Sequence, residues 1–487
     1  MRLSLVDLTI VVAYLIGITL FGLRFRREQH NLRDYFLGGG TAPWWALAFS
    51  IVATETSTLT IIGTPALAYS TNLGFLQLVL GYLVGRAMIT LVFIPHYFRG
   101  EFYTAYQLIE KRFGARMKSI AASTFLVTRS VAEGVRIAAI ALVVSVAFGT
   151  AERPAVFLVI VLTLLYTFEG GMKAVIWTDV AQLTIYLTGS AVAFVLLLYR
   201  IPGGWEEVTR VAAAAGGKLR VFDFAFSLKE KYTFWSGLLG GTFLTMASHG
   251  TDQTIVQRLL AARSERESKI ALLASGVIIL VQFTLFLVIG VMLYAYQQHT
   301  PLLTPGEKID RIFPAFVVRE MPRGLAGLVI AAIFAVAMSN ASGSLNSLAA
   351  SSVIDFYRLR GKVANQAEFL RLSRRMTLVW GGVLVLFGMV EWGPVLEAGL
   401  TVASLPFGCL LGLFLLGTLD QRATARGALF GMIAGLFTVL ALFFFTPLAF
   451  TWFVLAGSVT TYLVGSLASR VDRSAPLRPE SPLARNP

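Results

Sequence analysis

The sequence predicts an all-α protein that crosses a membrane many times. Of its 487 residues, 56% are hydrophobic and only 14% are charged, and the mean hydropathy is +0.72. Because a soluble domain has about 25% charged residues, this composition indicates that lipid surrounds most of the chain. Apolar runs of roughly 20 residues, the length that crosses a bilayer as a helix, recur along the whole sequence and alternate with short polar segments.

The hydropathy pattern predicts about thirteen spans. Their approximate limits are 5–23, 44–71, 74–98, 120–149, 154–169, 175–199, 234–259, 270–296, 325–355, 373–391, 394–418, 426–446 and 448–469. The first run contains Asp7 and lacks a small-residue cleavage site before Arg24. We therefore interpret it as a retained helix and not as a signal peptide.

The distribution of Lys and Arg predicts the orientation of the chain. Basic clusters follow the first, third, seventh, ninth, eleventh and thirteenth spans, and short basic loops remain in the cytoplasm. An odd number of spans puts all of these loops on one side, so we expect the N-terminus outside and the C-terminus in the cytoplasm, in a bacterial inner membrane. The formal charge of +14 is thus explained by topology, and no nucleic-acid partner is expected.

The parity of the spans also predicts two halves of opposite topology. Spans two to six and spans seven to eleven start from opposite sides, as in transporters built from inverted repeats. We expect an extra N-terminal helix with a basic loop (1–33), a first repeat (34–199), an extracellular loop (200–233), a second repeat (234–418), two C-terminal helices (419–470) and a disordered cytoplasmic tail (471–487).

The second span contains an unusually polar stretch at residues 50–60. This stretch holds six hydroxyl side chains and the carboxylate of Glu55, and polar groups at membrane depth are tolerated only where they face a cavity or other helices. Gly63 and Pro65 follow, so we expect an interruption of the helix near them. A broken, polar helix is how many transporters build an ion and substrate site. The alternative is a packed span whose hydroxyls bond their own backbone and whose Glu55 pairs with a neighbour.

Two later spans carry similar signals. Residues 245–253 form a polar run in span seven, which could also be interrupted, and His249 within this run is interpreted as a packed, hydrogen-bonded side chain. In span nine, the carbonyl of Val336 and the side chains of Ser339 and Asn340 lie on one helix face. Several neutral oxygens suit a cation such as Na⁺. The alternative is that the small residues of span nine only let another helix approach.

Span four carries Arg129, Glu133 and Arg136, which form one stripe of a helix. An Arg in the middle of a membrane should face the interior of the helix bundle. There Arg136 could hold a carboxylate through two hydrogen bonds. The alternative is an internal network in which Glu55 and Glu133 balance both arginines.

Other functional classes find little support in the sequence. There is no G-x-x-x-x-G-K-[ST] loop for ATP and no H-E-x-x-H motif, and the single Cys409 can form neither an internal disulfide framework nor a Cys/His metal cluster. We therefore expect a protein that is not an enzyme, and the sequence implies no protein partner.

Several segments resemble the sodium/solute symporters. They are residues 34–39 (Asp-Tyr-Phe-Leu-Gly-Gly), 53–65, 166–179 (from Tyr-Thr-Phe-Glu-Gly-Gly to Trp-Thr-Asp), 252–262 (Asp-Gln-Thr-Ile-Val-Gln-Arg-Leu-Leu-Ala-Ala) and span nine through Asn346. The resemblance extends over nearly the whole chain to about span twelve. It implies a leucine-transporter-type inverted repeat with one extra N-terminal helix, and uptake driven by sodium.

The resemblance also implies site residues. A shared sodium site would use the carbonyls of Ala53, Thr56 and Val336 and the side chains of Ser339 and Asn340, where relatives usually have Ser or Thr instead of Asn340. A second cation site in some members would use Asp179, Ser342 and a hydroxyl at position 343, which Gly343 lacks here. Glu55 stands where proline transporters of the family carry Asp and sugar transporters carry Asn. Arg136 matches an Arg that holds the substrate carboxylate in sialic acid transporters.

Together these features predict a sodium-coupled symporter that works by alternating access on a small solute, with Na⁺ as the co-transported ion. The expected substrate ligands are Glu55, Ser57, Thr60, Arg136, Ser248 and Asp252. Arg136 favours a carboxylate-bearing solute over a neutral sugar or polyol. Proton coupling through Glu55 is the second hypothesis. A receptor or channel is a third, although the tail after Arg470 is too short for a signalling domain.

Overall fold

The computed structural model describes residues 4–25, 32–99, 102–357, 366–390, 392 and 395–472. Within these ranges the chain contains helices and no strand, apart from an isolated bridge between Ala42 and Ala262. The predicted all-α class is confirmed.

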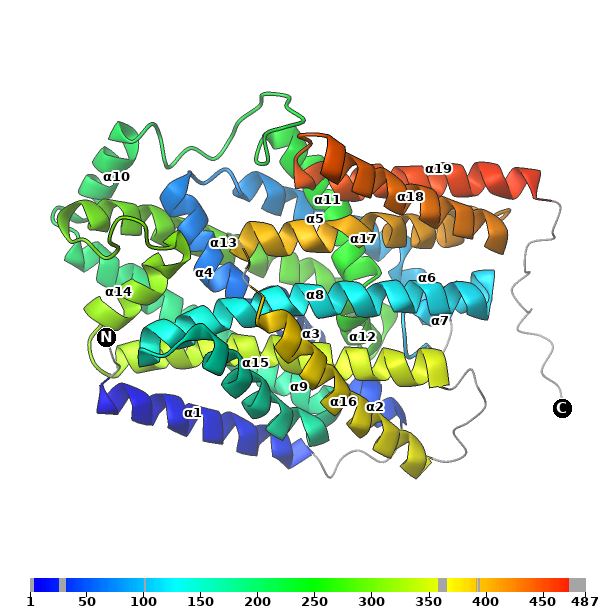
Figure 1. The fold of residues 1–487 in the computed structure, drawn as a ribbon, viewed down its shortest axis with the longest axis horizontal. Coiled ribbons are helices and arrows are strands. Elements are labelled where there is room, and N and C mark those ends of the chain that lie inside the picture. The colour runs from blue at the N-terminus through cyan, green and yellow to red at the C-terminus, as the bar shows by residue number, and fades with distance from the viewer. Residues whose placement is uncertain are drawn as a thin grey trace.

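The helices keep the order of the predicted spans (Figure 1). They are α1 Leu5–Leu23, α2 Leu32–Leu37, α3 Trp44–Glu55, α4 Thr58–Ser70, α5 Leu76–Val92, α6 Ile94–Phe98, α7 Tyr106–Phe113, α8 Ala115–Phe148, α9 Glu152–Arg200, α10 Gly204–Ala214, α11 Phe234–Gly250, α12 Gln253–Leu260, α13 Glu265–His299, α14 Ile312–Glu320, α15 Leu325–Ser351, α16 Gln366–Gly388, α17 Val395–Leu419, α18 Ala425–Phe445 and α19 Phe453–Val471.

Membrane-crossing length and composition are found in eight helices of the described residues, or nine if the bent pair α3–α4 counts as one span. The predicted number of thirteen is therefore not confirmed and remains a prediction. One reason is that charged side chains reduce the hydropathy of some predicted spans. Helix α8, for example, carries Arg129, Glu133 and Arg136 along one stripe.

Helix α9 covers both the fifth and the sixth predicted span. Its 49 residues would extend about 73 Å if straight, at 1.5 Å per residue. Near its start, Arg153 lines a cavity together with Asp310, and at its end Arg200 Nη1 lies 4.0 Å from Glu320. Since both partners belong to one short segment around α14, α9 cannot be straight over its whole length.

The second span breaks at a different place from the one predicted. The sequence indicated Gly63 and Pro65, but both lie inside α4, and the break falls at Thr56 and Ser57 with a bend of 63° between α3 and α4. The local reason is a helix start: the amide of Ser57 donates to Thr60 Oγ1 (3.3 Å) in a capping box. The break therefore lies within the polar stretch at residues 50–60.

The predicted interruption of span seven is found within the predicted run. Helix α11 ends at Gly250 and α12 begins at Gln253. Asp252 caps α12, because its Oδ1 accepts a hydrogen bond from the amide of Thr254 (2.8 Å). Both halves of the chain thus contain one broken helix, although the repeat boundaries themselves remain a prediction.

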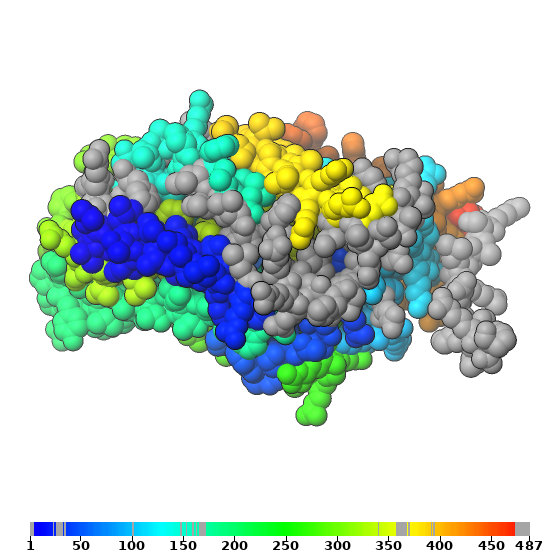
Figure 2. Space-filling model, turned by 90° about the horizontal axis from the view of Figure 1, so that it is seen from below, coloured from blue at the N-terminus to red at the C-terminus, as the bar shows by residue number. Residues whose placement is uncertain are grey.

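The broken helices lie inside the bundle and the terminal helices outside it. Helix α3 packs against α9, α13 and α15, and α12 packs against α3 and α15. Helices α18 and α19 form a hairpin against α17 at one edge (Figure 1). Helix α1 lies on the surface against α9 and α15 (Figure 2). This arrangement surrounds the polar breaks with apolar helices.

Candidate functional site

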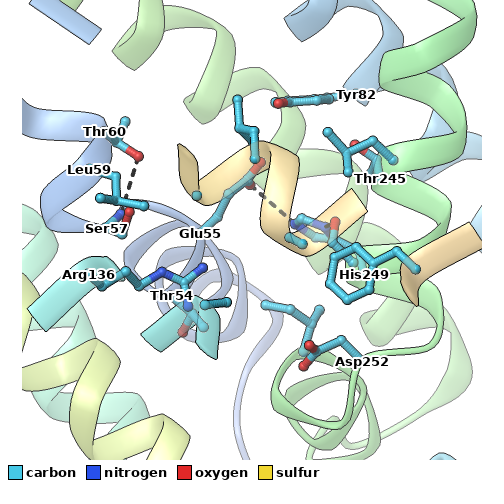
Figure 3. A pocket seen from close by; sticks show the side chains of 18 of the residues that line it. Thr54, Glu55, Ser57, Leu59, Thr60, Tyr82, Arg136, Thr245, His249 and Asp252 are labelled. Carbon is cyan, nitrogen blue, oxygen red and sulfur yellow. Dashed lines mark hydrogen bonds and ion pairs between the residues drawn. The ribbon is translucent and has the colours of Figure 1, made fainter. Parts of the chain in front are cut away.

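A cavity of about 130 Å³ lies where the two broken helices meet α5, α8, α13 and α17 (Figure 3). Part of its wall is apolar, with Phe75, Leu244, Phe283, Leu400 and Phe407 among the lining side chains. The rest is polar and comes from the ends of α3 and α11 and from one stripe of α8. Such a site can enclose a small solute and hold its polar groups at fixed positions.

All of the predicted substrate ligands line this one cavity. They are Glu55, Ser57, Thr60, Arg136, Ser248 and Asp252. They come from α8 and from the two broken helices, α3–α4 and α11–α12, which are far apart in the sequence. Figure 3 shows Arg136 on one side, His249 and Asp252 on the opposite side, and Glu55 between them. Their role as substrate ligands remains a prediction.

Arg136 has a donor to spare. One of its terminal nitrogens, Nη1, donates to Glu133 Oε2 (3.0 Å), while Nε is buried without a hydrogen-bond partner in the described residues. The same Glu133 oxygen also accepts from Ser344 Oγ (2.7 Å) and lies 3.6 Å from Arg129 Nη2. Since this carboxylate is shared by three donors, Arg136 can accept a second carboxylate from the cavity.

Glu55 has a partner that the sequence analysis missed. Its Oε2 is paired with Arg86 on α5 and lies 3.2 Å from His249 Nε2. Arg86 is fully buried and is also held by Ser275 Oγ (3.2 Å) and the carbonyl of Tyr82 (3.3 Å). A lone Arg within an apolar span is a recognised signal of an internal charge and would have indicated this partner. Of the alternative network, Glu133 does contact both Arg129 and Arg136, whereas Glu55 is paired with Arg86 instead.

The oxygens expected to bind sodium come together at the break between α3 and α4. Thr56 lies at the end of α3 and Val336 on α15, and the side-chain amide nitrogen of Asn340 lies 3.0 Å from both of their carbonyl oxygens. Ala53 is buried one turn before the break. The side chain of Ser339 lies outside the described residues. Neutral oxygens from two helices are a donor set that suits Na⁺, and the buried Oδ1 of Asn340 is a further oxygen without a hydrogen-bond partner in the described part.

The residues expected at a second cation site have a different environment. Asp179 is fully buried on α9 and pairs with Arg258 Nη2 (2.9 Å), and it also accepts from Ser50 Oγ (2.5 Å). Gly343 faces the same guanidinium, since a Cβ there would lie 3.4 Å from Arg258 Nη2. Ser342 is buried on α15. The guanidinium of Arg258 therefore already neutralises the carboxylate of Asp179. Binding of a second cation remains a prediction.

Comparison with known proteins agrees with this architecture. The sequence pattern of the sodium:solute symporter family matches residues 35–435. A sodium/sialic acid symporter of Aliivibrio fischeri is 32% identical over 465 residues, which is 94% of this chain and 91% of the relative. A sodium/sialic acid symporter of Proteus mirabilis is 28% identical over 473 residues, or 95% of each chain.

The solved structure of a Na⁺-coupled sialic acid symporter, in a substrate-bound outward-open state, superimposes with a TM-score of 0.89. The two chains share 28% of their residues, and the match covers 97% of this chain and 98% of the other. A transporter of the nucleobase-cation-symport-1 family in a closed conformation, at 13% identity and a TM-score of 0.57, shares the fold alone. The chain belongs to the sodium:solute symporter family and is a sodium-coupled solute symporter in a membrane.

Proposed function

We propose that this symporter takes up a carboxylate-bearing solute, with a carboxylated sugar of the sialic acid type as the first candidate. The observation that carries the proposal is Arg136, which faces the cavity with Nε unsatisfied and shares its single carboxylate partner with Arg129 and Ser344. The two sialic acid symporters among the relatives support the same substrate class.

The charges around the cavity favour binding of an anionic substrate together with one monovalent cation. Glu55 is balanced by Arg86, and Glu133 and Asp252 balance Arg129 and Arg136 when His249 is neutral. Because an uncompensated charge is costly in a low-dielectric interior, a monovalent cation at the break of α3 favours a substrate with one negative charge. A bound anionic substrate favours binding of the cation in turn, since coupling between two sites is reciprocal.

The ion would bind between α3 and α15, and the substrate would bind beside it in the cavity. Binding of both would favour the states in which the two halves close around them, and this alternating access would carry both across a bacterial plasma membrane. The N-terminus would lie outside and the C-terminus in the cytoplasm, as the basic loops indicate.

A thermal-shift experiment on the purified protein tests the substrate class. Ligands that bind only the folded protein raise its melting temperature. We expect sialic acid to raise it more in sodium than in choline, and the methyl ester of sialic acid, which lacks the negative charge, to have no such effect. Equal shifts with the acid and the ester would contradict a carboxylate site and would favour a neutral sugar.

A further inference from the structure

The side chain of Asn340 occupies the place where the ion should bind. Its Nδ2 donates one hydrogen bond to the carbonyl of Thr56 on α3 and one to the carbonyl of Val336 on its own helix, both at 3.0 Å. Its Oδ1 is buried and has no partner in the described residues. Since a carbonyl oxygen accepts and does not donate, only the nitrogen of the amide can face these two oxygens when no cation lies between them.

A sodium ion would require the opposite orientation. The two carbonyls would then point at the ion, and an amide N–H₂ group beside a cation would be repelled by it. If Asn340 turns about its terminal torsion, Oδ1 replaces Nδ2 at the site. This buried oxygen, which has no hydrogen-bond partner among the described residues, then gains the sodium ion as its partner. Serine or threonine could not satisfy both carbonyls in this way, because a hydroxyl has only one donor.

We infer that Asn340 is a built-in substitute for the ion: it donates to the two carbonyls when the site holds no sodium and turns its oxygen to the ion when sodium binds. This inference rests on the proposed sodium site between α3 and α15. It has two consequences. Sodium must compete with two internal hydrogen bonds, which lowers its apparent affinity, and the empty carrier keeps α3 and α15 joined while it returns across the membrane.

The variant Asn340→Ser tests this inference, with Asn346→Ser as the matched control. Asn346 is a second buried Asn on α15, but no hydrogen bond joins its Nδ2 to the described residues. We expect Asn340→Ser to melt at a lower temperature without sodium and to reach half of its sodium-induced shift at a concentration about tenfold lower than the wild type. The control should change neither value.

Net uptake and exchange provide a second readout. Exchange of labelled for unlabelled substrate at saturating sodium does not need the return of the empty carrier, whereas net uptake does. We expect Asn340→Ser to slow net uptake severalfold and to leave exchange close to the wild-type rate. Equal loss of both would overturn the inference.

The outcomes separate this inference from the proposed function. A wild-type protein that responds to sodium, with Asn340→Ser giving the same half-point, overturns the substitute role and leaves sodium coupling intact. If neither protein responds to sodium, both the sodium site and the inference fail. A response that appears only in Asn340→Ser overturns the inference too, because Asn340 would then never give up the site to sodium.

A different observation concerns the segment that joins α10 to α11. Four apolar side chains in alternating positions are strongly exposed: Phe222 (48%), Phe224 (64%), Phe226 (69%) and Leu228 (50%). The backbone between these side chains is bonded to the protein, since the amide of Asp223 donates to Gln77 Oε1 (2.9 Å). This aromatic strip therefore presents four apolar side chains outward from a backbone that is anchored to the bundle.

The strip is held in place by the ends of membrane helices. The amide of Phe234, at the start of α11, donates to the carbonyl of Asp223 (2.6 Å), and the amide of Ala449, before α19, donates to the carbonyl of Leu228 (2.9 Å). The ring of Phe226 contacts Trp452 with centroids 6.1 Å apart. Figure 1 shows the segment passing over the starts of α11 and α19.

The geometry points to the headgroup boundary of the bilayer as the partner of this aromatic strip. Phe224 contacts the ring of Phe234 at the start of α11 (centroids 5.1 Å apart), and exposed apolar side chains stand beside both anchors of the strip: Trp235 on α11, and Phe444 and Phe445 at the end of α18. Aromatic side chains concentrate at this depth of a membrane. A single row of rings also suits a lipid boundary better than a protein partner, which needs a broader patch.

Spin labels at positions 224 and 226 test this placement in phosphatidylcholine vesicles, in a Cys409→Ala background. The exposed Ala214 on α10 serves as the water control and Phe437 on α18, which is 73% exposed, as the lipid control. We expect labels on the strip to be more accessible to oxygen and less accessible to a water-soluble nickel chelate than the label at 214. Nickel access equal to that at 214 would overturn the proposal. The labels could instead be inaccessible to both oxygen and the nickel chelate and become accessible when the protein is diluted. That result would also overturn the proposal, because a second copy of the protein would then cover the strip.

Discussion

At the scale of single residues, the charge of Arg136 decides what the cavity can hold. Its Nη1 is bonded to Glu133, its Nε is buried without a partner in the described residues, and its side chain is 20% exposed toward the cavity. A guanidinium can bind a carboxylate through two parallel bonds, which a lysine ammonium cannot do. This residue therefore sets the preference for an acid.

We expect Arg136→Gln to weaken binding of the carboxylated substrate by about 30-fold, which corresponds to the roughly 2 kcal/mol of a charge-assisted hydrogen bond. Arg136→Lys should recover only part of this loss. Substrate titrations by thermal shift in saturating sodium measure both effects. Wild-type affinity in Arg136→Gln would show that another group holds the carboxylate.

The pair of Glu55 and Arg86 gives a prediction about stability. Arg86 is fully buried, so Glu55→Gln leaves a buried charge uncompensated, and removal of one partner of such a pair costs about 3–5 kcal/mol. The double variant Glu55→Gln/Arg86→Met should be more stable than Glu55→Gln alone, because no unpaired charge remains. Denaturation of the wild type, Glu55→Gln, Arg86→Met and the double variant in detergent forms the complete cycle, and additive losses would contradict the pairing.

At the scale of elements, close approach of helices depends on glycine. Helix α5 crosses α11 so closely that a Cβ on Gly81 would lie 2.5 Å from the carbonyl oxygen of Gly237, and a Cβ on Gly241 would lie 2.3 Å from the carbonyl oxygen of Leu78. Backbone atoms cannot move aside as a flexible side chain can. The crossing brings Arg86 of α5 to the broken end of α11, where His249 lies.

We expect Gly81→Ala to destabilise the protein by about 1–3 kcal/mol or more, the cost of overpacking a tight contact. Gly382→Ala on α16 is the matched control, because a Cβ there would have no other atom within 4 Å. In an exposed helix this control should be neutral or slightly stabilising. Comparison of melting temperatures measures the difference, and equal behaviour of the two variants would contradict the packing described here.

The sequence predicted most elements but not their internal geometry. Long apolar runs determine helices strongly, and the polar run at 245–253 correctly indicated where a helix breaks. The position of the first break was missed because Gly63 and Pro65 are tolerated inside α4, while the capping pair Ser57 and Thr60 starts a new helix. Capping depends on local hydrogen bonds, which hydropathy does not report.

The side-chain partners were predicted less well. The cavity ligands followed from the polar stretches of spans two, four and seven and line one cavity, but Arg86 was overlooked within an otherwise apolar run. The pairing of Asp179 with Arg258 joins residues 79 positions apart in the sequence. Such contacts depend on how helices pack in three dimensions, and a single sequence carries no direct signal of them.

At the scale of the whole molecule, the chain is a bundle in which two broken helices share an interior polar site. The basic loops predict that α10 faces the outside and that the turn between α17 and α18 faces the cytoplasm. In a Cys409→Ala background, a membrane-impermeant maleimide should label Ala214→Cys in intact cells, and Gln421→Cys only after permeabilisation. Both positions are exposed. The reverse pattern would show that the orientation is wrong.

Coupling of substrate uptake to sodium is tested most directly by transport into proteoliposomes at equal pH on both sides. The labelled substrate is the carboxylated solute that gives the largest thermal shift, and the external salt is sodium or choline. We expect accumulation above the external concentration with an inward sodium gradient and none with choline. Accumulation in choline, or accumulation driven by a proton gradient without sodium, would contradict it.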